Sequence, residues 1–285
     1  KLNVRDVRYQ EGGSNIMVIP ERFQRRIDAH MLGNMLDIEN YPLILAIIGK
    51  PGMGKTYQLR HYLVTVGVKV FSISAADLES DRAGEPAKLL KRKYLEASDC
   101  ITDGNPSALL IDDVDTTLGE WKNYTGTVNH QDVLAVLMHL ADSPCYIEDV
   151  GSTNRVPVFL TGNQFDRLYV PLVRTGRTIR YDWEPTRAEK IEIVNSIFNF
   201  SSKNISKRLV DAFPDAPVSF FSTLLAEKCT EMLTSLTSST LIFKAVLTNK
   251  RYRSKLISDY NSIWSKMDWV STLPHTGAAE RGASD

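Results

Sequence analysis

One short segment limits the folds open to this chain more than any other. Residues 49–56 read Gly-Lys-Pro-Gly-Met-Gly-Lys-Thr, which fits the pattern G-x-x-x-x-G-K-[S/T]; they lie between an apolar run at 43–48 and a helical pattern at 56–66. Glycines in such a loop let backbone N–H groups close around phosphate oxygens at the positive end of the helix dipole. A glycine-rich turn that binds nothing is the alternative, and the agreement of strand, loop and helix disfavours it.

The same loop predicts which side chains meet a nucleotide. Lys55 is expected to pair with the β- and γ-phosphates, and the Thr56 hydroxyl to ligate Mg²⁺. The expected ligands are therefore ATP and Mg²⁺. The residues expected to hold them are Gly49, Pro51, Gly52, Met53, Gly54, Lys55, Thr56, Tyr57 and, from a later strand, Asp112.

Short apolar runs alternate with helical patterns through the first two thirds of the chain. Near-continuous apolar strands separated by helices are typical of a parallel sheet covered on both faces. The expected strands are 43–48, 68–73, 108–111, 156–160 and 178–181, and the expected helices between them are 56–66, 86–99 and 129–141. The pattern predicts an α/β fold with a five-stranded parallel sheet.

The pattern changes after Glu184, where no strand is convincing. Thr186 is a favourable helix cap, and helical spacing follows at 187–198, 206–213, 220–236 and 241–247. A helix is also expected at 21–36, with Phe23, Ile27, Met31 and Met35 on one face. The expected domains are an N-terminal segment and helix at 1–40, the α/β domain at 41–184, a small helical lid domain with C-terminal helices at 185–270, and a flexible tail at 271–285.

Polar side chains end two of the expected strands. Asp112 and Asp113 follow the run at 108–111; the first can hold Mg²⁺, directly or through its water shell, and the second can polarise an attacking water. Asn163 ends the run at 156–160 and can orient that water. Taken alone, each could merely form a turn, and the phosphate loop favours the catalytic interpretation.

Two arginines, Arg174 and Arg177, precede the last expected strand. An arginine that reaches a neighbouring subunit's γ-phosphate would stabilise the charge of phosphoryl transfer. The alternative is a pair of solvated surface arginines, the usual fate of this residue.

Composition excludes several classes of protein. Lys+Arg and Asp+Glu both total 34, so a generally basic nucleic-acid coat is excluded. Three scattered cysteines support neither a disulfide framework nor a zinc site, and a reducing interior fits best. No run approaches the roughly 20 apolar residues that span a bilayer. We expect no membrane association and a cytoplasmic location, or the plastid stroma if a transit peptide has been removed.

Longer stretches resemble one family of AAA+ ATPases, the Rubisco activases. The resemblance covers about residues 42–221 and is most specific in five segments: LESDRAGEPAKL at 78–89, TVN at 127–129, LMHLADSP at 137–144, TGNQFDRLYVPLVRTGR at 161–177 and LVDAFP at 209–214. It implies the AAA+ P-loop NTPase fold, and a hexameric ring that binds ATP between subunits. It also implies that Arg174 and Arg177 act across the interface, and that loops at 79–88 and 116–126 line a central pore.

The resemblance also implies a function: a ring that hydrolyses ATP to pull on Rubisco and release inhibitory sugar phosphates. Three departures qualify it. The family usually has Asn-Asp where Asp112 and Asp113 stand, and arginines where Leu225 and Glu227 stand, so that Lys228 is the nearest replacement. The region after residue 240 does not match the family's substrate-recognition helix. Two alternatives therefore stay open: a motor acting on nucleic acid or another effector complex through the basic segment 250–255, and a nucleotide-switched assembly scaffold.

Overall fold

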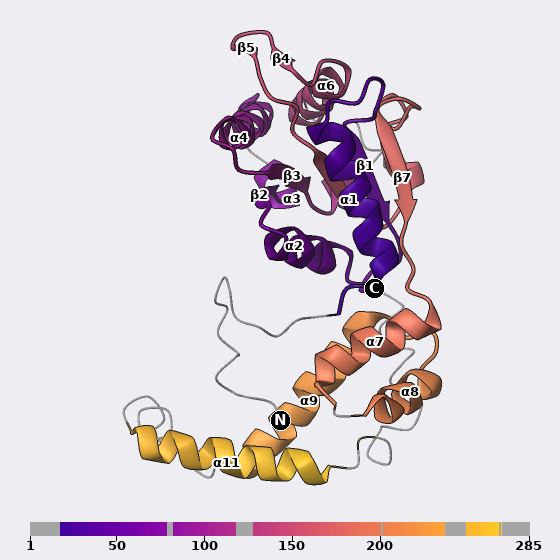
Figure 1. Cartoon of the computed structure of the whole chain (residues 1–285), viewed down its shortest axis with the longest axis vertical. Coiled ribbons are helices and arrows are strands. Elements are labelled where there is room, and N and C mark those ends of the chain that lie inside the picture. The colour runs from indigo at the N-terminus through magenta and orange to yellow at the C-terminus, as the bar shows by residue number, and fades with distance from the viewer. Residues whose placement is uncertain are drawn as a thin grey trace. The chain divides into compact units, whose positions relative to one another are not determined.

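The computed structural model describes residues 18–78, 82–117, 128–200, 202–236, 249–267 and 269 (Figure 1). The described chain divides into two compact units, one spanning Ile19–Glu184 and the other containing the residues from Pro185 onward. Each unit has its own hydrophobic core. No described helix is both long and apolar enough to span a lipid bilayer.

The first unit is built around a five-stranded sheet in the order β2-β3-β6-β1-β7, with every neighbouring pair parallel. Its strands are β1 (Ile44–Ile48), β2 (Lys69–Ile73), β3 (Ser107–Ile111), β6 (Val158–Gly162) and β7 (Thr178–Asp182). Every residue of β1, β3 and β6 is buried, which is why these strands read as continuous apolar runs. The predicted parallel sheet is confirmed.

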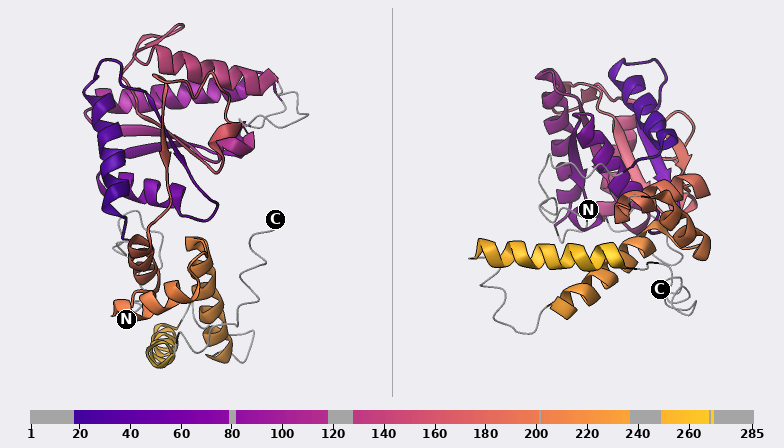
Figure 2. Two further views of the ribbon diagram at one scale, coloured as in Figure 1. Left: turned by 90° about the vertical axis from the view of Figure 1, so that its right-hand side faces the viewer. Right: turned by 60° about the horizontal axis from the view of Figure 1, so that its bottom comes forward.

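Helices cover both faces of this sheet (Figure 2). On one face lie α1 (Glu21–Met35) and α2 (Lys55–Thr65), which share a core with Leu45 and Ile47. On the other lie α4 (Glu85–Thr102) and α6 (Val128–Asp142), which share a core with Ile44, Ala46 and Ile48 of β1. Alternate residues of one strand thus serve opposite layers, as the period of a strand requires.

Helix α1 begins where the sequence predicts, but its apolar face is shorter than expected. Phe23, Ile27 and Met31 are buried, whereas Met35 is 48% exposed, so the expectation for that residue is wrong. The reason is that the preceding residue, Asn34, takes the buried position at the end of the helix, where its side chain donates to the carbonyl of Pro42 and accepts from Arg155. Phe23 packs edge-on against Trp183 with ring centroids 4.6 Å apart. Because of such contacts the first unit includes α1 and starts at Ile19, before the expected domain start at residue 41.

Several short elements have no counterpart among the expected ones. They are α3 (Ala75–Leu78), α5 (Val114–Thr117), the 3-10 turn η2 (Phe165–Arg167), and an antiparallel hairpin of β4 (Tyr146–Ile147) and β5 (Gly151–Ser152). Elements of two to four residues are too short to show an apolar period. Two of them, α5 and η2, follow the ends of β3 and β6 and so lie beside the candidate site.

The second unit is helical throughout its described residues. Its helices are α7 (Arg187–Phe198), α8 (Lys203–Ala212), α9 (Val218–Leu236) and α11 (Lys250–Lys266). Thr186 caps α7 as predicted, and Glu189 completes a capping box. Trp264 and Trp269 are buried in this unit's core and attach the end of α11 to it. The helix expected at 241–247 lies outside the described residues.

Candidate active site

The phosphate-loop motif forms the turn between β1 and α2. Gly52 and Gly54 have φ angles of 72° and 76°, a region that side chains with a Cβ rarely occupy. Gly49 is required for a different reason, because a Cβ there would lie 2.1 Å from the carbonyl oxygen of Trp183. Gly52 and Gly54 therefore allow a backbone conformation that other residues rarely adopt, and Gly49 allows the close approach of another backbone segment.

Trp183 holds both ends of this loop. Its backbone N–H donates to the carbonyl of Ile48 at 2.6 Å, and its indole Nε1–H donates to the carbonyl of Met53 at 3.2 Å. The Trp183 ring is itself only 1% exposed. Trp183 therefore fixes the loop at two points: at Ile48, where β1 ends, and at Met53, just before Gly54.

Lys55 is the centre of a small hydrogen-bond network. Its Nζ donates to the carbonyls of Gly49 at 2.7 Å and Lys50 at 3.0 Å, and to Asn163 Oδ1 at 2.9 Å. Burial lowers the pKa of the Lys55 ammonium, and the neighbouring carboxylates, led by Asp113, oppose that effect. The lysine expected at the phosphates and the strand-terminal asparagine thus meet, although 108 residues separate them.

Hydroxyl and carboxylate oxygens gather beside Lys55. Thr56 Oγ1 donates to Asp112 Oδ1 at 2.6 Å and lies 3.2 Å from Thr161 Oγ1, and Thr161 also donates to Asp112. Oxygen ligands of this kind suit Mg²⁺, which commonly takes one or two protein oxygens together with phosphates and waters. Within the described ranges, no group of three His, Cys, Asp or Glu side chains could hold a metal. The donor set therefore fits a magnesium ion that is shared with a nucleotide.

Asp113 directly follows this oxygen cluster and has an unusual backbone. Its φ angle is 50°, in the left-handed region that Asp tolerates better than most residues. Partial burial raises the pKa of the Asp113 carboxyl, the charges of Asp112 and Asp115 add to the increase, and Lys55 opposes it. A carboxylate with a raised pKa is a better proton acceptor than an ordinary surface aspartate.

A cavity of about 390 Å³ opens beside these groups, at the carboxyl ends of β6, β1 and β7. Gly49, Lys50 and Asn163 line it, together with Arg180 and Glu184. Ligands in parallel α/β sheets bind at this edge. The phosphate loop, Asp112, Asp113 and Asn163 therefore share one end of one sheet.

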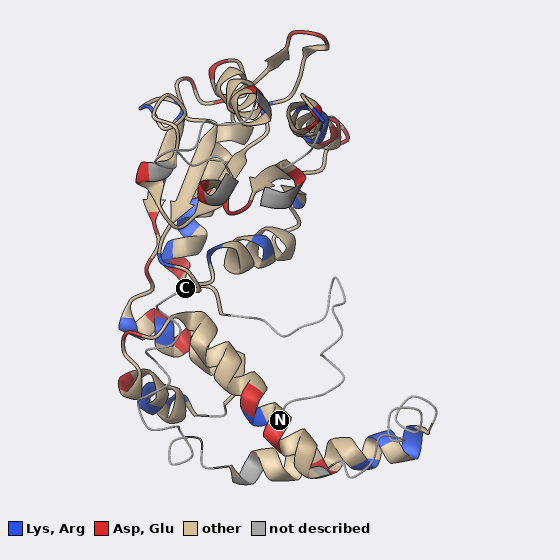
Figure 3. Cartoon of the chain, turned by 180° about the vertical axis from the view of Figure 1, so that it is seen from behind, with Lys and Arg blue, Asp and Glu red and all other residues tan. Residues whose placement is uncertain are grey.

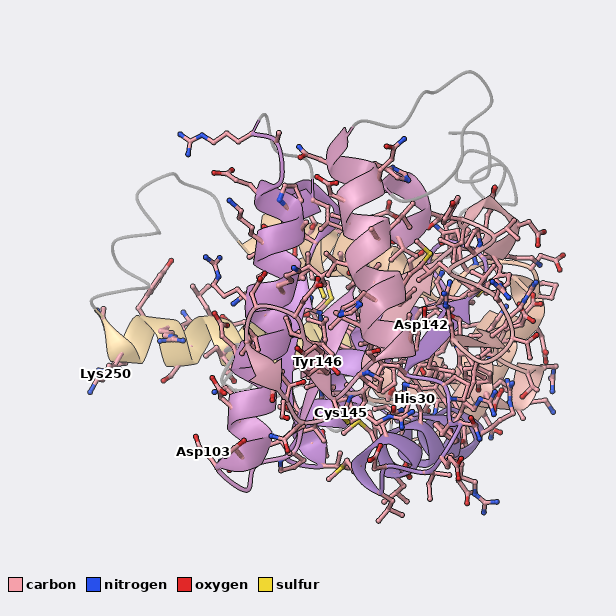
Figure 4. The ribbon with its side chains drawn as sticks, turned by 90° about the horizontal axis from the view of Figure 1, so that it is seen from above. His30, Asp103, Asp142, Cys145, Tyr146 and Lys250 are labelled. Carbon is pink, nitrogen blue, oxygen red and sulfur yellow. The ribbon has the colours of Figure 1, made fainter. Side chains whose placement is uncertain are left out.

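The two arginines lie elsewhere. Arg177 directly precedes β7 and so lies at the amino ends of the strands. The phosphate loop lies at their carboxyl ends, a strand length of roughly 16 Å away. It is bound to Asp142, at the end of α6 (Figure 4), through Nε to Oδ1 at 2.6 Å and Nη2 to Oδ2 at 2.5 Å. Its Nη1 donates to the carbonyl of Pro171 at 2.7 Å. The Arg174 side chain is exposed and makes no hydrogen bond or ion pair with the described residues, although its charge helps to lower the pKa of Asp142.

Asp142, Arg155, Arg174 and Arg177 line a second cavity of about 390 Å³ at the amino ends of the strands. The bidentate Arg177–Asp142 pair lowers the pKa of Asp142 and raises that of Arg177, because each charge stabilises the other. Within one chain, then, the arginines are separate from the nucleotide site.

Sequence reasoning missed three residues of this arrangement. Thr161 lies inside the β6 run, where it reads as a strand residue, and Trp183 reads as a core aromatic after β7. Asp115 is the third aspartate in a short acidic segment, and only the fold shows that it alone is buried, at 5% exposure. A periodic signal identifies none of the three, because each acts through a partner distant in sequence.

Other expected positions are described only in part. Residues 79–81 and 118–127 lie outside the described residues, and with them most of the expected pore loops, although the end of the first begins α4. In the helical unit, Lys228 pairs with Glu231 at 2.9 Å on α9, and its side chain is 12% exposed. The replacement for the family's arginines is thus held by a local partner.

Comparison with known proteins agrees with this fold. The sequence model for "ATPase family associated with various cellular activities (AAA)" matches residues 45–182, which hold the sheet and the phosphate loop. These residues form an AAA ATPase domain. It is 37% identical over 233 residues to the chloroplastic Rubisco activase of Cucumis sativus, covering 78% of this chain and 56% of the relative.

Two further Rubisco activases are similar to this AAA protein. The chloroplastic activase 1 of Larrea tridentata is 40% identical over 219 residues, and that of Zea mays is 39% identical over 218; each alignment covers 73% of this chain. The alignments cover 46% and 50% of these relatives, so the chain spans about half the length of the curated relatives it matches.

Proposed function

We propose that this AAA protein hydrolyses ATP at the carboxyl edge of its sheet. The observation that carries the proposal is the meeting of Lys55 with Asn163, and of Thr56 with Asp112, beside one phosphate loop. Lys55 would exchange its present carbonyl partners for phosphate oxygens. Thr56 and Asp112 would hold Mg²⁺, which when bound neutralises charge on the β- and γ-phosphates.

Asp113 and Asn163 would prepare the water that attacks. The raised pKa of Asp113 makes it the proton acceptor, and the Asn163 amide orients the same water. Asp113→Asn should then lower kcat at least a hundredfold, the range typical of a lost general base, while ATP still binds. Unchanged turnover in this variant would contradict the assignment of Asp113.

Assembly would complete the site. We propose a ring, which the resemblance to Rubisco activases suggests is a hexamer. In this ring the surface of one subunit that carries Arg174 and Arg177 faces the phosphate loop of the next subunit. Arg174, exposed and without an ion pair, is then the better placed to reach a neighbour's γ-phosphate, while Arg177 keeps its segment attached to Asp142. Arg174→Ala should abolish assembly-dependent turnover without changing ATP affinity in the monomer. If only Arg177→Ala did so, the two roles would be reversed.

The proposed work of the ring is the remodelling of a protein client, and the proposed client is Rubisco, from which inhibitory sugar phosphates would be released. Support comes from relatives named as Rubisco activases, whose names also place them in chloroplasts and favour a plastid location here. The test is recovery of carboxylation by sugar-phosphate-inhibited Rubisco from the same organism. Wild type with ATP should restore activity, and Lys55→Ala should not. No recovery with an ATP-hydrolysing wild type would exclude this client.

One observation favours a second candidate, a nucleic-acid or effector-complex motor. Lys250, Arg251, Arg253 and Lys255 gather in the N-terminal part of α11, where Lys250 marks the helix end (Figures 3 and 4). Positive charge at a helix N-terminus is unfavourable unless an anion compensates it. Stimulation of ATP hydrolysis by DNA, lost with rising salt, would favour this candidate over Rubisco.

A further inference from the structure

A buried carboxylate outside the expected catalytic set lies beneath the turn that carries Asn163. Asp115 is on α5, two residues after Asp113, and is 5% exposed. A carboxylate is seldom buried unless it accepts hydrogen bonds or pairs with a positive charge. Helix α5 packs against β6, so Asp115 lies against the strand that ends in Gly162.

The two oxygens of Asp115 bracket residue 163. Oδ2 accepts the backbone N–H of Gln164 at 3.2 Å. Oδ1 lies so near Gly162 that a Cβ at that glycine would be 2.9 Å from it, and Oδ1 has no hydrogen-bond partner among the described residues. One oxygen therefore fixes the residue after Asn163 and the other contacts the residue before it.

Asn163 is the residue between these two contacts, and its side chain reaches Lys55 Nζ at 2.9 Å. Beyond Gly162 no sheet partner holds the backbone that carries this asparagine. Orientation of a catalytic amide to within a fraction of an ångström requires support from residues around it. Lys55 bonds to the Asn163 side chain, and Asp115 supplies a side-chain hydrogen bond to the backbone of the same turn.

We propose that Asp115 is a positioning residue for ATP hydrolysis: its carboxylate holds the turn at 162–164 so that the Asn163 amide faces Lys55 and the water to be activated. This inference rests on the hydrolytic function proposed above. Asp115 touches neither phosphate nor water in this role. Its hydrogen bond to Gln164 acts through Asn163, whereas its charge also helps to raise the pKa of Asp113. Asp115→Asn removes that charge and keeps the acceptor, so the two effects can be separated.

The test is a double-mutant cycle on steady-state hydrolysis by the assembled protein, with ATP affinity measured separately by a fluorescent ATP analogue. Asp115→Ala should lower kcat about tenfold, the factor that corresponds to loss of one hydrogen bond of about 1.4 kcal/mol, and leave ATP affinity unchanged. In the Asn163→Ala background the same substitution should change kcat by less than about twofold, because its effect passes through Asn163. Asp115→Asn keeps an acceptor for Gln164 N–H and should regain most of the lost rate.

Ser107 supplies a matched control away from the site. Ser107, at the other end of β3, is fully buried and donates to the carbonyl of Ala97 at 2.6 Å. Ser107→Ala removes a buried hydrogen bond of similar kind and should lower stability while leaving kcat unchanged. If Asp115→Ala does not fold, Gly162→Ala disturbs the same turn by displacing the carboxylate, and it should lower kcat at constant ATP affinity.

The outcomes separate this inference from the function on which it rests. A slow Asn163→Ala variant beside a fully active Asp115→Ala or Gly162→Ala variant would overturn the positioning role alone. Multiplicative effects of Asp115→Ala and Asn163→Ala on kcat would overturn it as well. Wild-type turnover in Asn163→Ala would overturn both the inference and the proposed role of Asn163.

Discussion

Neutral His30 should make the α/β unit sensitive to mild acid. His30 lies on α1 (Figure 4). It is 1% exposed and donates from Nε2 to the carbonyl of Val158 at 3.2 Å. Its Nδ1 has no partner among the described residues. Burial lowers the pKa of His30 from 6.5 to about 3; the backbone hydrogen bonds oppose that effect, and the charges of Arg26 and Arg155 add to it.

The linkage between protonation and folding gives the sign and the size of the change in the free energy of unfolding with pH. Below pH 6.5 the unfolded chain binds a proton at His30 that the folded chain does not bind until about pH 3, so the free energy of unfolding falls as pH falls through this window. One pKa unit corresponds to about 1.4 kcal/mol, so pH 5, about 1.5 units below the unfolded value, should cost about 2 kcal/mol. Above pH 6.5, His30 should contribute no pH dependence.

The assay is urea unfolding at pH 7.5 and at pH 5. Unfolding is monitored by hydrogen exchange in peptides from β1 and β6, because these peptides report on the α/β unit alone. The comparison is His30→Gln, which keeps an N–H donor for Val158 but does not titrate. Every other titratable group is common to both proteins. The wild type should lose about 2 kcal/mol more than the variant between the two pH values. Equal losses would show that His30 is not buried in its neutral form.

Three further substitutions test other parts of the structure. Lys55→Ala should weaken ATP binding roughly tenfold to a hundredfold, the value of one or two charge-assisted hydrogen bonds, measured with a fluorescent ATP analogue. Gly49→Ala should destabilise the α/β unit by about 1–3 kcal/mol, because the new Cβ meets the carbonyl of Trp183; an unchanged melting temperature would refute this close approach. Trp269→Ala should destabilise the helical unit by about 3–5 kcal/mol in thermal unfolding and leave the exchange of β1 peptides unchanged.

The strands and the nucleotide edge could be predicted because their signals are local. Complete burial of β1, β3 and β6 produces uninterrupted apolar runs, and the phosphate loop fixes which strand precedes α2. Parallel strands then place Asp112, Asp113 and Asn163 at a common edge without further information. The outer strand β2 was also predictable from its apolar run, although most of its residues are only half-buried or exposed.

The remaining features depend on contacts between segments far apart in sequence. The Arg177–Asp142 pair spans 35 residues, and neither residue carries a local pattern that names its partner. Asp115 follows two aspartates that are themselves plausible catalytic groups, so its burial is not visible before folding. Met35 shows the converse error, since helical spacing predicts a face but not which of two adjacent residues, Asn34 or Met35, the fold buries.

Trp183 has a consequence for communication along the chain. Its backbone and indole hold the phosphate loop at Ile48 and Met53, and Pro185, where the helical unit begins, is only two residues further on. A nucleotide that shifts either carbonyl would therefore act on a residue two positions before the start of the helical unit, with no intervening element. The Trp183 indole is also an intrinsic fluorophore, so its emission should report nucleotide binding at the loop in a variant whose other three tryptophans are replaced.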